Sequence, residues 1–164
     1  LLRQREPIHA TWSYRSMLGG VLAQETDRAV ETTAEMKPVT KVAPTAEELT
    51  DLVFVTKLVK HSKSNAIVLA KGGQLIASGV GQTSRVDALK QAIEKARHFG
   101  FELQGAVLAS DAFFPFDDCV TLAAEAGITA IAQPGGSVRD ADSIAAADAH
   151  GIAMVMTGVR HFKH

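Results

Sequence analysis

The sequence predicts an α/β fold, and three observations lead to this expectation. Short apolar runs at 105–109, 128–132 and 152–156 have the length of buried strands. The segments between them have helical spacing, and Gly127 and Gly151 stand where a helix would end. Because strands that alternate with helices pair in parallel through right-handed crossovers, we expect a β-α-β-α-β unit in this half of the chain.

The first expected unit, residues 1–44, is a partial strand followed by a connecting segment. Residues 15–24 have strand character interrupted by two adjacent glycines. Residues 25–44 are rich in threonine, glutamate and proline, and two prolines discourage regular structure. This stretch is therefore expected to be an exposed connection.

The second expected unit, residues 45–164, begins with a helix. Thr45 and Glu48 have the spacing of a capping box, and apolar positions at helical spacing continue to about His61. Ser84 is a good N-cap for the next helix. The other expected elements are hairpin strands at 66–70 and 74–78 around a Lys-Gly-Gly turn, and helices at 85–98, 117–126 and 140–150.

Composition excludes several classes of protein. Seventeen basic and 18 acidic residues give a formal net charge of -1, which argues against a nucleic-acid partner. The apolar runs are too short to span a bilayer, and a single cysteine favours a reducing compartment. It also cannot supply the ligands of a zinc deaminase. Since the chain starts with Leu1, we expect it to be part of a longer protein.

Several segments fall where open α/β sheets bind ligands, beyond the carboxyl ends of strands. Residues 110–116 contain three phenylalanines, which either pack onto the core or form an apolar ligand wall. Residues 133–137 form either an anion site of backbone amides or a plain turn. The basic segment 157–164 is either solvated or part of the same site, whereas Arg85 in the loop 79–85 suits an oxyanion.

The segment 60–65 combines amine, imidazole, hydroxyl and amide groups. His61 and Lys63 are interpreted as a solvated helix end, where cations meet the negative end of the helix dipole. Asn65, at the start of a strand, is the better candidate for a buried polar contact.

Five strings, KSNAIVLAK, GQTSRVDA, SDAFFPFDD, ITAIAQPGGSVRDAD and HGIAMVMTGVRHFKH, resemble one known family over residues 15–164. It is the bifunctional purine-biosynthesis family that combines aminoimidazole carboxamide ribotide (AICAR) formyltransferase with inosinate (IMP) cyclohydrolase. The resemblance implies a zinc-free, cytidine-deaminase-like three-layer fold with a mixed, partly parallel sheet. It also implies a cytoplasmic homodimer that takes AICAR and 10-formyltetrahydrofolate at its subunit interface, with no membrane or nucleic-acid partner.

The same resemblance assigns roles to individual residues. Asn65 would contact the nucleotide near its reacting amine and take part in catalysis. The remaining implied sites are the AICAR-binding residues Arg85, Phe113 and Arg160, the folate-binding residues Val86, Asp118, Gly136, Ser137 and Val138, and a potassium site near Val59, Ser62, Ser64 and Asp111.

One departure from the family pattern limits this assignment. Lys60-His61 looks like the family's catalytic pair, but its context KHSKSN belongs to the later asparagine motif, so His61 is not assigned as the general base. We therefore expect the base, the first half of the domain and the cyclohydrolase to lie outside this chain, and the chain alone to be inactive. The alternative is a non-catalytic nucleotide-binding or interaction module derived from the same domain.

Overall fold

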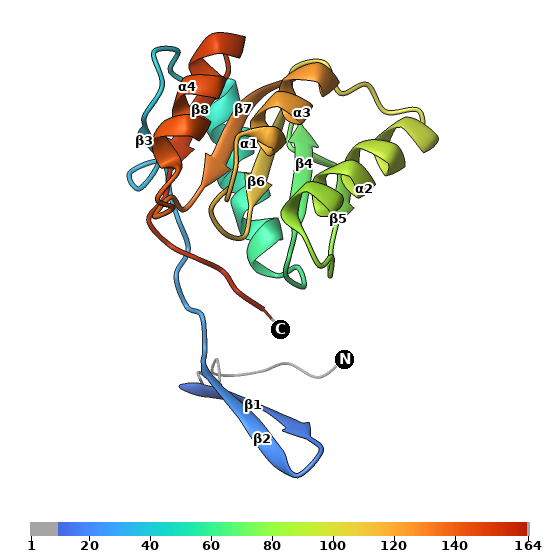
Figure 1. Ribbon diagram of the computed structural model, residues 1–164, viewed down its shortest axis with the longest axis vertical. Coiled ribbons are helices and arrows are strands. Elements are labelled where there is room, and N and C mark those ends of the chain that lie inside the picture. Colours follow the sequence, from blue (N-terminus) through green and yellow to red (C-terminus); the bar gives the residue numbers. More distant parts are fainter. Residues whose placement is uncertain (1–9, 164) are drawn as a thin grey trace, which may run out of the picture.

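The computed structural model describes residues 10–163 and shows a mixed α/β fold (Figure 1). Within this range, one sheet of six strands has the order β3-β8-β7-β6-β4-β5. Three neighbouring strands, β6 (Ala106–Ser110), β7 (Ile128–Gln133) and β8 (Ala153–Met156), run parallel. The expected β-α-β-α-β unit is thus confirmed, and each element boundary lies within one residue of its expected position.

The other half of the sheet is antiparallel. The expected hairpin consists of β4 (Ile67–Lys71) and β5 (Gln74–Gly79), and its glycine turn has φ values of +59° and +72°. β4 also pairs antiparallel with β6, which places Ile67 opposite Ser110. The start of β4 therefore lies beside the carboxyl end of β6.

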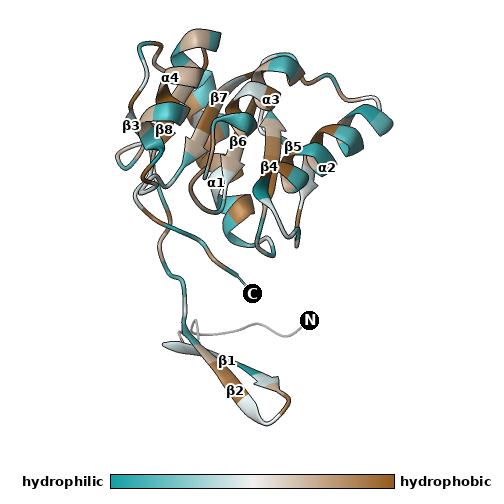
Figure 2. Cartoon of the chain, viewed as in Figure 1, coloured by the Kyte–Doolittle hydropathy of each residue, from teal (hydrophilic) through white to brown (hydrophobic). Residues whose placement is uncertain are grey.

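Helices cover both faces of the sheet because side chains alternate along each strand. Ile67 and Leu69 face a core that includes residues of α2 (Arg85–His98), α3 (Asp118–Ala126) and α4 (Asp140–His150). Residues Val68 and Ala70 face α1 (Ala46–Lys60), which starts at the expected Thr45 capping box. Figure 2 shows the apolar residues concentrated in the central strands and hydrophilic residues along α2.

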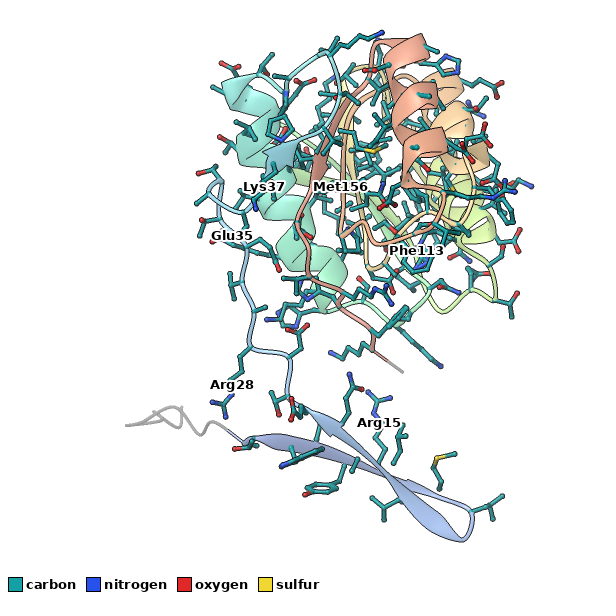
Figure 3. The ribbon with its side chains drawn as sticks, turned by 60° about the vertical axis from the view of Figure 1, so that its left-hand side comes forward. Arg15, Arg28, Glu35, Lys37, Phe113 and Met156 are labelled. Atoms are coloured by element: carbon teal, nitrogen blue, oxygen red, sulfur yellow. The ribbon has the colours of Figure 1, made fainter. Side chains whose placement is uncertain are left out.

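The N-terminal part differs from expectation in two ways. Residues 15–24 belong to a hairpin of two strands, β1 (Trp12–Met17) and β2 (Gly20–Glu25), which projects away from the sheet (Figure 1). The connection after it is not exposed throughout, because Glu31 and Met36 are buried. In addition, β3 (Lys37–Pro38) pairs with β8, and Lys37 lies opposite Met156 (Figure 3). Pro38 is accommodated because β3 is an edge strand.

Gly79, at the end of β5, has a packing role that the sequence did not reveal. A Cβ atom at this position would lie 1.8 Å from the carbonyl oxygen of Ala88 in α2. Glycine is therefore needed for the close approach of strand and helix. The loop 79–85 was singled out as a candidate oxyanion site, but its first glycine is required for the packing of β5 against α2.

Candidate functional site

The candidate site lies at the end of the sheet where β6, β7 and β8 finish. The antiparallel pairing of β4 with β6 brings Asn65, just before β4, to the same end. The N-terminus of α2 supplies Arg85, and the segment after β8 supplies Arg160. A groove of about 310 Å³ is present there. Its lining residues are Asn65, Thr83, Ser84, Arg85, Ala112, Phe113, Pro115 and Phe162.

Arg85 is the centre of a buried polar network. Its Nη2 lies 2.8 Å from Asp111 Oδ1, and its Nη1 donates to Asn65 Oδ1 at 2.8 Å. The Nε donates to Ser110 Oγ at 2.8 Å. Burial lowers the pKa of Arg85 from its usual value, and the nearby carboxylate of Asp111 opposes that shift. Most of the hydrogen-bond donors of the guanidinium are therefore used by contacts within the protein. Its expected contact with a substrate phosphate stays a prediction.

Asn65 is held in one orientation by this network. Its Oδ1 accepts from Arg85, whereas its Nδ2 donates to the carbonyl oxygens of Gln82 at 3.0 Å and Thr83 at 3.3 Å. These contacts connect the start of β4 to the loop that precedes α2. The side chain at the edge of the groove is consequently preorganised.

The phenylalanine loop packs partly onto the core and partly borders the groove. Phe114 is fully buried, and its backbone N–H donates to the side-chain oxygen of Gln133 at 3.0 Å. Phe113 is half-buried in the groove, and the Arg160 guanidinium lies over its ring at 4.7 Å from the centroid. One phenylalanine therefore anchors the loop in the core, while its neighbour offers an aromatic wall. Figure 3 shows where Phe113 lies in the fold.

The loop 133–138 is a turn whose backbone amides are bound by a nearby carboxylate of the protein. The Oδ2 of Asp140 accepts the N–H of Gly136 at 2.7 Å, and Oδ1 accepts that of Ser137 at 3.2 Å. These amides thus face a carboxylate of the chain instead of an open anion site, which favours the plain-turn alternative. A Cβ at Gly136 would lie 3.4 Å from an Arg160 nitrogen, so the loop borders the same arginine as Phe113. Val138 is fully exposed.

The start of α3 carries two further candidates for chemistry. Asp118 is exposed, and its carboxylate accepts the backbone N–H of Cys119 at 2.7 Å. Burial, followed by the nearby charge of Asp118, raises the pKa of the Cys119 thiol to about 12. The cysteine is therefore unsuited to act as a nucleophile. Val86 lies partly buried against the core at the start of α2.

The residues expected near potassium gather where α1 ends and β6 ends. Asp111 is fully buried, its Oδ1 accepts from Arg85 and Ala66, and its Oδ2 has no hydrogen-bond partner among the described residues. Such an oxygen would be satisfied by a cation, so the carboxylate fits the expected ion. Ser64 Oγ accepts the N–H of Lys163, whereas Ser62 Oγ donates to Leu58 within α1. Val59 is buried in that helix.

Sequence reasoning missed a second polar cluster beside this site. His161 is 2% exposed, and its ring nitrogens lie 2.6 Å from Asp27 Oδ2 and 3.0 Å from Glu31 Oε1. Lys60 is also buried and lies 3.7 Å from Asp27, whereas His61 is exposed, as expected for a helix end. Asp27 and Glu31 are more than 100 residues from His161, and no local pattern links them. His164 lies outside the described residues.

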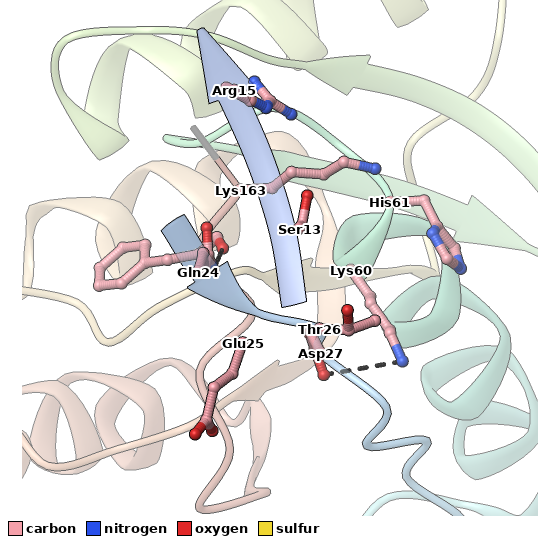
Figure 4. A pocket seen from close by; sticks show the side chains of 10 residues that line it. Ser13, Arg15, Gln24, Glu25, Thr26, Asp27, Lys60, His61 and Lys163 are labelled. Atoms are coloured by element: carbon pink, nitrogen blue, oxygen red, sulfur yellow. Dashed lines mark hydrogen bonds and ion pairs between the residues drawn. The ribbon is translucent and has the colours of Figure 1, made fainter. Parts of the chain in front are cut away.

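A cavity of about 240 Å³ adjoins this cluster, between the β1–β2 hairpin, the end of α1 and the C-terminal segment (Figure 4). Arg15, His61 and Lys163 contribute side chains to its lining. The cavity is separate from the groove at Asn65, although Phe162 borders both.

Known proteins match this chain over most of its length. A family model described as AICARFT/IMPCHase bienzyme matches residues 1–95. The bifunctional purine biosynthesis protein PurH of Bacteroides thetaiotaomicron is 66% identical over 92% of this chain, and that of Aquifex aeolicus is 55% identical over 92%. The chain spans about 30% of the length of these relatives.

Solved structures with a similar arrangement include two deaminases. One is a diaminohydroxyphosphoribosylaminopyrimidine deaminase/5-amino-6-(5-phosphoribosylamino)uracil reductase of Thermotoga maritima, with 25% identity and a TM-score of 0.47 over 65% of this chain and 34% of that chain. The other is the dCMP deaminase of cyanophage S-TIM5, with 16% identity and a TM-score of 0.48 over 64% of this chain and 94% of that chain.

Two structural findings concern the described range only. No cluster of three or more His, Cys, Asp or Glu residues suited to holding a metal ion occurs within 10–163. No helix in that range has both the length and the apolar character needed to cross a membrane.

Proposed function

The chain belongs to the AICARFT/IMPCHase bienzyme family, and we propose that it is the C-terminal part of an AICAR formyltransferase domain. The reaction is the transfer of a formyl group from 10-formyltetrahydrofolate to AICAR, which gives FAICAR in the biosynthesis of IMP. The observation that carries this proposal is the family match together with the groove in which Asn65, Arg85 and Phe113 meet.

The chemistry is an attack by the 5-amino nitrogen of AICAR on the formyl carbon. A C–N bond forms to that nitrogen, the bond to N10 of the folate breaks, and the amine loses a proton while N10 gains one. The amine is a poor nucleophile because its lone pair is delocalised into the ring. Orientation, a base and stabilisation of the developing oxyanion must therefore lower the barrier.

In this proposal, the described residues bind and orient the nucleotide. Asn65 contacts the nucleotide near its amine, and Phe113 stacks along its ring. Arg160 and Arg85 attract its phosphate, because the forked donors of arginine suit bidentate contacts. Arg160 fits this role well, because its guanidinium has only the Phe113 ring as a partner among the described residues. The general base comes from residues outside 1–164.

The folate lies on the other side of the groove in this proposal. Asp118 is exposed and would contact the pterin. Val86 and the segment 136–138 would border the folate in this proposal. The Asp140 carboxylate fixes the backbone of that segment. A potassium ion would be held by Asp111 Oδ2 and by groups of Ser64, Ser62 and Val59. It would satisfy the Asp111 oxygen that Arg85 does not contact and help to fix the segment before Asn65.

We further propose a cytidine-deaminase-like, three-layer and zinc-free architecture for residues 45–164, with 1–44 leading in from the preceding part of the domain. The functional unit would be a cytoplasmic homodimer with the active site at the subunit interface. A cyclohydrolase domain of the same protein would then close the purine ring.

The test compares formyl transfer by the 164-residue chain and by the protein at full length. We expect the full-length protein to convert AICAR and 10-formyltetrahydrofolate to FAICAR and the isolated chain to show no turnover. Arg160→Ala in the full-length protein should raise the KM for AICAR by about tenfold or more, the effect of one lost charge-assisted contact. Binding of AICAR without turnover at full length would indicate the non-catalytic module, and turnover by the isolated chain would place the base within it.

A further inference from the structure

The segment that carries Arg160 is fixed to the fold on both sides of this residue. Upstream, the N–H of Gly158 donates to the Pro134 carbonyl at 3.0 Å. Downstream, the N–H of His161 donates to the Asp111 carbonyl at 2.9 Å. Arg160 therefore lies in a short span between the loop after β7 and the end of β6.

The side chain of His161 adds a second set of contacts at the downstream anchor. Both of its ring nitrogens lie at hydrogen-bond distance from carboxylate oxygens, Asp27 on one side and Glu31 on the other. In either tautomer the ring donates to at least one of them. Lys60 donates to the Ala29 carbonyl. It also pairs with Asp27, as Figure 4 shows. We name these four side chains, His161, Asp27, Glu31 and Lys60, the tail latch.

The tail latch joins three parts of the chain that are distant in sequence. Asp27 and Glu31 come from the connection after β2, Lys60 from the end of α1, and His161 from the C-terminal segment. His161 and Glu31 are each 2% exposed. Buried ionisable groups are costly to separate once they are paired, so the cluster strongly favours one position of the C-terminal segment over alternatives.

We propose that His161 is a positioning residue for Arg160. Its ring contacts fix the backbone one residue after Arg160, and this directs the guanidinium over the Phe113 ring and beside Gly136. Without the ring contacts, the span from Gly158 onward has fewer anchors, and Arg160 samples orientations that do not face the groove. The effect on substrate binding rests on the proposed function, whereas the effect on the C-terminal segment does not.

The test uses the full-length protein with two substitutions at His161. His161→Leu replaces the ring by an apolar side chain that still fills the space, and it removes both ring contacts. His161→Gln retains a side-chain donor for one carboxylate. Asp51→Ala is the matched control, because this buried carboxylate accepts the N–H groups of Gly72 and Gly73, both at 2.7 Å, in a turn far from the tail. The measurements are KM and kcat for AICAR, and hydrogen exchange of peptide 157–163 by mass spectrometry.

We expect His161→Leu to raise the KM for AICAR by about tenfold with kcat changed by less than about threefold, because binding is lost and the chemical step is not. Peptide 157–163 should exchange faster, and His161→Gln should recover part of both effects. Asp51→Ala should change neither readout. An unchanged KM in His161→Leu, or an equal rise in Asp51→Ala, would overturn the inference. Absence of formyl transfer in the wild-type protein would instead refute the proposed function, and unchanged exchange would still overturn the latch.

Discussion

Replacing Asp111 by asparagine removes the negative charge that faces Arg85 but keeps the shape of the side chain. The carboxylate is fully buried and lies 2.8 Å from the Arg85 Nη2, which is itself almost fully buried. Asparagine can still accept hydrogen bonds from Arg85 and Ala66 through its Oδ1, so the main loss is charge compensation. A buried ion pair broken from one side typically costs about 3–5 kcal/mol of stability.

The assay is urea denaturation of the 164-residue chain, followed by circular dichroism. Asp111→Asn should lower the free energy of unfolding by about 3–5 kcal/mol, and Arg85→Met should do so by a similar amount. The loss of unfolding free energy in the double variant should be at least about 2 kcal/mol smaller than the sum of the two single losses, because the double variant leaves no buried charge without a partner.

The control is Asp142→Asn, which removes an exposed pairing with Arg139 at 3.9 Å. Exposed pairs of this kind contribute about 1 kcal/mol or less. If Asp111→Asn costs no more than this control, Arg85 does not depend on Asp111 for its charge balance. Additive single effects would likewise contradict the coupled network around Asn65.

Two further predictions follow from close contacts and burial. Gly79→Ala should lower the free energy of unfolding by about 3 kcal/mol or more in the same urea assay, because the new Cβ would overlap the Ala88 carbonyl. The control is Gly20→Ala, where a Cβ would have nothing within 4 Å, and it should change the free energy of unfolding by less than about 0.5 kcal/mol. A mild effect at Gly79 would show that β5 and α2 can separate at little cost. Because burial raises the pKa of Cys119 from 9.0 to about 12, its thiolate at pH 8 should be about 1000-fold scarcer than in the unfolded chain. Iodoacetamide should therefore label it far more slowly in the native chain than in urea, and equal rates would contradict the burial of the thiol.

The sequence predicted which segments form the candidate site, but it did not predict the contacts between their side chains. The βα alternation places residues 110–116, 133–137 and 157–163 at one edge of the sheet, and all three lie there. The resemblance to a family named the residues within them. The contact that determines what Arg85 is free to do was not visible, because Arg85 bonds Asp111 across 26 residues and no local pattern encodes that pairing. Asp140 closes the 136–137 turn from only three and four residues away, a local contact that was not assigned from the sequence.

The sequence by itself determined the helices and strands of residues 45–163, since periodicity, capping and glycine positions are local properties. The Thr45 capping box and the helix 85–98 appear where the sequence placed them. Only the tertiary structure decided which residues of the connection 26–44 are buried. Its two prolines indicated an exposed segment, yet Glu31 is buried against His161, 130 residues away. A pairing of that range depends on how the sheet brings chain ends together, and the free energy of such a contact exists only once the fold has formed.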